Sequence, residues 1–128
     1  MRTHQRIIPN PKYPYPMESR KTINIPQHPA AVMNAARQVA MNPPKGFTLG
    51  QIIDHAYAIT MTRGMSMASW GENITIQVYA GPHDDAILDI VSKPAMPTQI
   101  VDWGRGNGNV ATLADAIMIA LGYPGAPK

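Results

Sequence analysis

Short stretches of this chain alternate polar and apolar residues, which is the pattern of strands with one buried face. The clearest runs from Asn73 to Tyr79, where Ile74, Ile76 and Val78 share one side. The turn residues Gly81-Pro82-His83-Asp84 come directly after it. Three further stretches have strand character: Lys21 to Ile25, Ala86 to Ser92, and a short piece from Gln99 to Trp103.

Two stretches instead repeat apolar residues at the helical period. Pro29 suits the first turn of a helix that runs to about Met41. Its apolar stripe consists of Val32, Met33, Ala36, Val39 and Ala40. A second helix is expected to open near Asn109 and to stop at Gly122 and Pro124, since glycine and proline are typical of the residues just after a helix.

Residues 48–62 fit two patterns. The apolar positions from Leu49 to Tyr57 have helical spacing, and Thr48 with Gln51 could form a capping box. However, Gly50 lies inside this stretch, and residues 58–62 alternate as a strand does. We interpret the segment as a hairpin that turns near Asp54-His55.

The order β-α-β-β-β-β-α predicts an α+β fold, with an antiparallel sheet of four to five strands and two helices on one face. A chain of 128 residues has the size of one domain. We expect an extended arm over residues 1–20, a single α+β domain over residues 21–123 and a tail over residues 124–128.

The basic charge of the chain is concentrated in the arm. Residues 1–21 hold five Lys or Arg residues and one Glu, whereas the rest holds six basic and seven acidic residues. Four prolines between positions 9 and 16 forbid a helix and favour an extended chain. The body is therefore nearly neutral, and it lacks the basic patch of a typical nucleic-acid-binding domain.

No pattern of residues in the sequence identifies a catalytic site. The absence of Cys excludes disulfides and thiolate metal sites, and no two of the four histidines have the i, i+4 spacing of metal ligands on a helix. The segment from Gly64 to Ala68 approaches the G-x-S-x-G pattern, but a strand follows it where that motif needs a helix. We expect no catalytic residue, metal or cofactor, and a non-enzymatic role.

The glycine-rich segment Gly104 to Asn109 follows an expected strand and opens an expected helix. Its backbone N–H groups could bind an anion, with Arg105, Gly106, Asn107 and Asn109 as the contributing residues. The alternative is a tight turn in which one of the two asparagines caps the helix.

Two Trp-Gly motifs stand at corresponding places, Ser69-Trp70-Gly71-Glu72 before a strand and Asp102-Trp103-Gly104-Arg105 before the last helix. In these motifs the chain resembles small uncharacterised bacterial α+β domains, a resemblance that spans roughly residues 21–121 and implies a fold without an activity. We hypothesise that both tryptophans pack near one end of the sheet and that Glu72 and Arg105 approach each other.

The composition of the arm indicates association. Tyrosine is favoured at interfaces, and extended Pro-rich segments are common recognition elements. We expect a non-enzymatic interaction or structural module, a small subunit that docks on a protein partner or a second copy through its arm. The docking residues would be Pro11, Tyr13, Pro14, Tyr15 and Pro16.

The alternative is that the basic arm and the Gly104–Asn109 loop bind an anion, either nucleic acid or an acidic lipid. The N-terminus has no apolar signal segment, and no apolar run is long enough to cross a bilayer. A cytoplasmic location is therefore expected.

Overall fold

The computed structural model describes residues 18–64, 71–95 and 105–127, without the side chains of residues 105 and 106. Within these ranges the chain forms five strands and two α-helices, with one turn of 3-10 helix, η1 (Asp54–Ala56), between the second and third strands. The elements are β1 (Ser19–Ile25), α1 (Pro29–Met41), β2 (Phe47–Ile53), β3 (Ala58–Arg63), β4 (Glu72–Ala80), β5 (Ala86–Pro94) and α2 (Arg105–Ala120).

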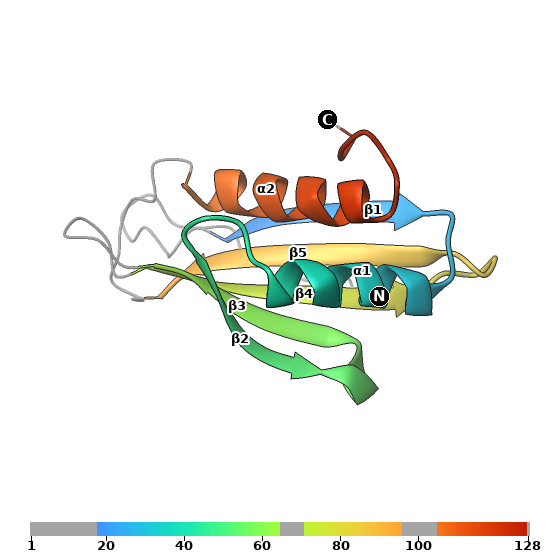
Figure 1. Ribbon diagram of the computed structural model, residues 1–128, viewed down its shortest axis with the longest axis horizontal. Helices are drawn as coiled ribbons and strands as arrows, with labels where there is room; N and C mark the ends of the chain where they lie inside the picture. Colours follow the sequence, from blue (N-terminus) through green and yellow to red (C-terminus); the bar gives the residue numbers. More distant parts are fainter. Residues whose placement is uncertain (1–17, 65–70, 96–104, 128) are drawn as a thin grey trace, which may run out of the picture.

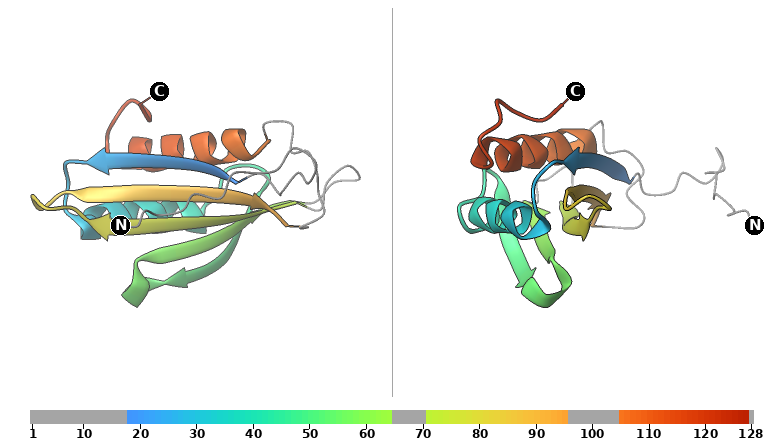
Figure 2. Two further views of the ribbon diagram at one scale, coloured as in Figure 1. Left: turned by 180° about the vertical axis from the view of Figure 1, so that it is seen from behind. Right: turned by 90° about the vertical axis from the view of Figure 1, so that its right-hand side faces the viewer.

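The strands form one antiparallel sheet in the order β1-β5-β4-β3-β2 (Figure 1). Both helices lie on the same face of this sheet, with α2 alongside β1 and α1 further along toward β3 (Figures 1 and 2). The predicted α+β class and the two helices on one face of an antiparallel sheet are confirmed.

The core lies between the sheet and the two helices. On the sheet, the alternate residues of each strand that face the helices are apolar, as with Ile76, which stands opposite Ile59 on one side and Ile90 on the other. The helices contribute the stripes around Val32 and Leu113. Burying each such side chain contributes about 1.5–3 kcal/mol, so the apolar pattern accounts for the packing of both helices onto one face.

Neither helix of the described residues covers the opposite face of the sheet (Figure 2). Its alternate positions are polar, among them Thr22, Thr75 and Lys93, and Glu18 joins Arg20 and Lys93 in ion pairs of 3.6 and 3.7 Å. Surface pairs of this length contribute little to stability, about 0–1 kcal/mol each. We call this side of the sheet the outer face.

Residues 47–63 form the expected hairpin rather than a helix. The chain turns through η1, and the register shifts by a β-bulge between Leu49 and Gln51. Gly50 stands at the bulge because a Cβ there would come within 2.6 Å of the Thr60 hydroxyl and 2.8 Å of its carbonyl oxygen. The helical spacing of the apolar residues was misleading because the bulge changes which residues face the core.

Two predicted boundaries differ from the structure. The last helix begins at Arg105, four residues before the predicted start, because glycines at an exposed helix N-terminus do not prevent helix formation. A Cβ added at Gly108 would meet no other atom within 4 Å, so this position is open. β1 begins at Ser19 rather than at Lys21. The short strand expected over residues 99–103 lies outside the described residues.

Candidate functional site

The end of the sheet where β1 and β4 begin holds a buried polar cluster. It consists of Ser19, Glu72, Ser92 and Asn109, which are between 0 and 8% exposed. Ser19 stands opposite Ser92 in the β1–β5 ladder, and the Asn109 side-chain amide of α2 donates a hydrogen bond of 3.3 Å to the Ser92 hydroxyl. The cluster therefore connects α2 to the sheet, and its burial closes it to a solute.

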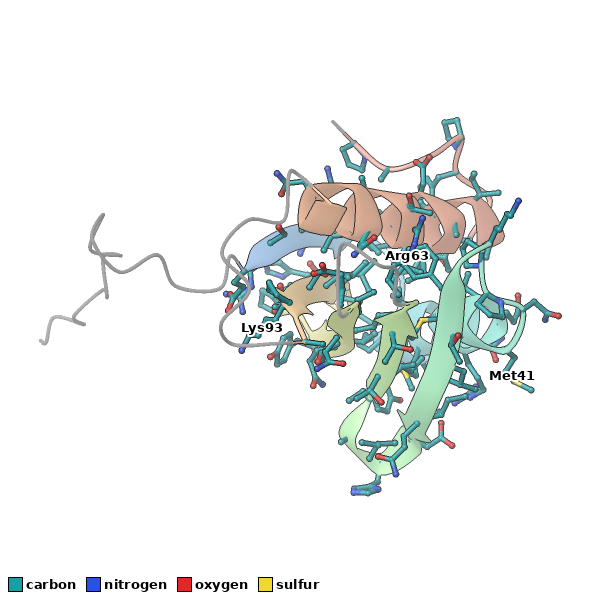
Figure 3. The ribbon with its side chains drawn as sticks, turned by 90° about the vertical axis from the view of Figure 1, so that its left-hand side faces the viewer. Met41, Arg63 and Lys93 are labelled. Atoms are coloured by element: carbon teal, nitrogen blue, oxygen red, sulfur yellow. The ribbon has the colours of Figure 1, made fainter. Side chains whose placement is uncertain are left out.

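Glu72 lies at the start of β4, opposite Arg63 of β3 and Pro94 of β5. The Arg63 guanidinium stands 4.6 Å from the centroid of the Phe47 ring, a cation–π geometry. Figure 3 looks onto this end of the sheet and labels Arg63, together with Lys93 near the end of β5. Glu72 is 1% exposed, and burying a carboxyl group costs free energy unless the group is paired.

The predicted anion-binding residues fall in the first turns of α2. Asn107 is exposed, Asn109 faces the sheet, and Arg105 and Gly106 belong to the helix with side chains outside the description. The structure thus brings Glu72 and Asn109 to one end of the sheet. The other predicted positions, Trp70, Asp102, Trp103 and the arm residues from Pro11 to Pro16, lie outside the described residues, so the Glu72–Arg105 hypothesis stays a prediction.

A groove opens at the other end of the sheet, where α1 begins and where β4 turns into β5. It encloses about 500 Å³. We call it the His28 groove; its lining residues are His28, Pro29, Tyr57, Val78, Ala80, Gly81, Asp84 and Asp85. The lining comes from the start of α1, from Tyr57 between η1 and β3, from β4 and from the turn after β4, so the groove depends on the tertiary fold.

His28 caps the N-terminus of α1. Its Nδ1 accepts a hydrogen bond of 3.0 Å from the Ala30 N–H, and its carbonyl oxygen accepts from the N–H groups of Ala31 and Val32 at 2.9 and 3.2 Å. Pro29, the first helical residue, has no N–H. The first-turn donors of α1 are therefore all used within the protein. The imidazole Nε2 remains and lies 3.7 Å from Asp84 Oδ1.

The turn between β4 and β5 supplies the acidic side of the groove. Asp85 accepts hydrogen bonds of 3.0 Å from the Asn24 side-chain amide and of 3.0 Å from the His83 N–H, and these bonds, that from Asn24 foremost, lower the pKa of its carboxyl below 3.8. Gly81 permits this arrangement, because a Cβ there would lie 2.1 Å from Asp85 Oδ1. Asp84 has a left-handed backbone (φ 59°), which aspartate tolerates better than most residues.

Tyr57 forms the wall of the groove on the side of η1. Its backbone is left-handed (φ 52°, ψ 44°), an uncommon state for a bulky residue. Three hydrogen bonds hold it: its N–H donates to Asp54, and its carbonyl accepts from Val78 N–H and the Gln77 side chain. Residues held in such conformations cluster at ligand sites, which makes Tyr57 a candidate binding residue.

Sequence reasoning missed the His28 groove. The sequence predicts a turn at Gly81 to Asp84 and leaves Tyr57 in an ambiguous stretch, and it assigns no function to either. A histidine directly before a helix-opening proline was the available signal, but the residues of the groove are up to 57 positions apart. Only the pairing of β3 with β4 brings Tyr57 beside Val78.

Two classes of site were also sought in the described residues. Within residues 18–64, 71–95 and 105–127, three or more His, Asp or Glu side chains nowhere come together as a metal site. None of the helices in these ranges has the length and apolar character needed to cross a membrane.

Comparison with known proteins identifies the fold. No protein-family model and no curated protein sequence matches the chain. Among solved structures, Ara h 8.0201 is similar with a TM-score of 0.60 at 10% identity, over 83% of this chain and 94% of that one. Norcoclaurine synthase from Thalictrum flavum has a TM-score of 0.62 at 8% identity, over 94% of this chain and 96% of that one, both alone and in complex with dopamine and hydroxybenzaldehyde. At these identities the similarity shows a shared fold.

Proposed function

We propose that this protein is a binding module that holds a small, partly apolar molecule in the His28 groove. The observation that carries the proposal is the lining of the groove, in which Pro29, Val78 and Ala80 form apolar walls and the acidic residues stand together on the β4–β5 turn. Ligand sites in proteins are typically concave and mostly apolar, with a few polar groups that fix orientation.

The fold supports this proposal at the level of architecture. A structural neighbour, norcoclaurine synthase, has been solved with dopamine and hydroxybenzaldehyde bound, so a sheet and helices of this shape are compatible with small organic ligands. The residues proposed for this chain come from its own groove, since 8% identity transfers no individual role.

The test compares a substitution that fills the groove with the same kind of substitution on the outer face. Ala80 and Thr75 both lie on β4 and are exposed, but Ala80 lines the groove and Thr75 faces the other side of the sheet. Small aromatic and aliphatic fragments are screened against the full chain by ligand-observed NMR. Ala80→Phe should weaken the fragments that bind about tenfold or more, whereas Thr75→Phe should leave them within about twofold. Equal effects of the two variants, or no bound fragment, would contradict the proposal.

We also propose that the chain associates with a protein partner or a second copy through its arm. The support comes from the sequence, where prolines and tyrosines alternate beside cationic residues. Because β1 begins at Ser19, residues 1–17 can be deleted without cutting a strand. The deletion should abolish association, measured as native mass in extracts of the source cell, and leave thermal unfolding of the body unchanged. Association that survives the deletion would refute this role.

Matched arm variants separate protein docking from anion binding. Replacing Tyr13 and Tyr15 by Ser removes the aromatic anchors and keeps the charge, and replacing Arg2, Arg6 and Lys12 by Ser does the reverse. Docking on a protein predicts that the tyrosine variant loses association. If the charge variant is instead the one that loses association, and if binding to single-stranded DNA or anionic vesicles weakens steeply as the salt concentration rises, the arm binds anions.

A further inference from the structure

We propose that the His28 groove selects an organic cation, a molecule with an apolar body and an ammonium group. The body would lie against the apolar walls, and the ammonium group would lie at Asp84 and Asp85. This inference rests on the proposed function of the groove and names the chemical class of its ligand.

The permanent charges among the described lining residues of the groove are negative. No Lys or Arg is among its described lining residues, whereas two aspartates stand side by side on its rim. His28 uses its Nδ1 to accept the hydrogen bond from the Ala30 N–H, and its Nε2 lies 3.7 Å from Asp84 Oδ1. A bound ammonium group would therefore meet two carboxylates, with no Lys or Arg among the described lining residues to compete for them.

The two carboxylates have complementary roles. Asp85 is fixed in place by Asn24 and by the His83 N–H, and these same bonds lower the pKa of its carboxyl. Each of its oxygens has a further lone pair that can accept a bond from a ligand. Asp84 has a side chain that is 80% exposed and lies 3.7 Å from the Nε2 of His28, so it can turn toward a ligand at little cost.

The helix N-terminus at the groove does not reverse this preference. Helix N-termini attract anions through N–H groups that lack an internal partner. Here Pro29 has none, and the N–H groups of Ala30, Ala31 and Val32 donate to the side chain or carbonyl of His28. An anionic ligand would find no free first-turn donor and would face the two aspartates.

Tyr57 adds a second source of affinity for the same ligand class. Tyr57 is one of the residues that line the groove. An ammonium group near the face of an aromatic ring is attracted by the ring quadrupole, and apolar parts of a ligand pack well against the same ring. Carboxylates and an aromatic wall in one groove are the combination that recognises organic ammonium compounds.

Three probes with the same phenylethyl body and different charge test the inference: 2-phenylethylammonium, 2-phenylethanol and 3-phenylpropionate. Their affinities for the full chain are measured by NMR titration at neutral pH and low salt. The ammonium compound should bind about tenfold more tightly than the alcohol, and the carboxylate most weakly. Asp84→Asn should weaken the ammonium compound about fivefold and leave the alcohol within about twofold.

Asp84→Asn is a mild change, because asparagine is also favoured in the left-handed conformation of this residue. Glu18→Gln is its matched control, since it removes one carboxylate at the opposite end of the sheet, and it should change no affinity. Equal binding of the ammonium compound and the alcohol would overturn the cation inference and leave the groove as a binding site. Failure of all three probes to bind would overturn the inference together with the proposed function.

Discussion

Asp85 links the acidic side of the groove to the first strand through a single side-chain bond. Asn24 of β1 donates to its Oδ2, and this bond is the largest cause of its lowered pKa. The folded-state pKa lies below the ordinary 3.8, so the stabilisation from this carboxylate is present at neutral pH. It is lost as the pH falls below about 4 and through the folded-state pKa.

Asn24→Ala should therefore raise the pKa of Asp85 toward its ordinary value, as measured by carboxyl-carbon NMR titration. Thr22→Ala is the control on the same strand, because the Thr22 hydroxyl donates to Asp89 instead. It should leave the titration of Asp85 unchanged. A pKa of Asp85 that stays low in Asn24→Ala would show that the turn itself, through the His83 N–H, sets the value.

Asn109 and Asn107 provide a second matched pair at the residue scale. Both lie near the start of α2, but Asn109 is buried and bonded to Ser92 whereas Asn107 is exposed. Asn109→Ala leaves the buried Ser92 hydroxyl without this donor and should lower the free energy of unfolding by about 1–3 kcal/mol. Asn107→Ala should change it by less than about 0.5 kcal/mol. Urea unfolding measures both, and similar losses would contradict the assigned role of the cluster.

The sequence could not distinguish these two asparagines. Both belong to a glycine-rich segment that suggested a loop, and in a loop both would have been open to an anion. Once α2 begins at Arg105, the helical period alone turns Asn109 toward the sheet and leaves Asn107 outside. Their different environments therefore follow from where α2 begins, and the glycines of this segment hide that boundary in the sequence.

At the scale of elements, two glycine-to-alanine changes should have opposite signs. In Gly50→Ala the new Cβ would approach the Thr60 carbonyl oxygen within 2.8 Å, and a backbone atom cannot easily move away. We expect a loss of about 1–3 kcal/mol in the free energy of unfolding.

Gly108→Ala should instead stabilise the protein by about 0.5–1 kcal/mol, since Gly108 is helical and has no neighbour near a Cβ. Thermal unfolding of the two variants, compared with the unchanged chain, measures both effects. If Gly50→Ala proved neutral, the bulge between Leu49 and Gln51 would not require glycine.

The elements themselves were largely predictable. Alternation at Ile74, Ile76 and Val78 identified β4, and Pro29 with the following apolar stripe identified α1 from its first to its last residue. These signals are local, because each strand or helix carries its own period. The extra residue of the β-bulge was not visible, since a bulge depends on the partner strand and not on the spacing within one strand.

For the molecule as a whole, the two ends of the sheet differ in a way that the sequence did not predict. One end is closed by the polar cluster around Ser92, and the other opens into the His28 groove. The groove joins residues from the start of α1, Tyr57 directly after η1, and β4 with its following turn, which the fold places together. Such a site has no motif, so only the folded chain reveals it.

The central claim is that this groove holds a small ligand. The most direct measurement is an amide chemical-shift map of the full, nitrogen-15-labelled chain titrated with 2-phenylethylammonium. The account predicts saturable shifts concentrated at residues 28–31, at Tyr57 and at residues 78–85, with the outer-face amides around Thr75 and Val91 changed least. Shifts centred on the outer face, or no saturable shift at the groove, would contradict it.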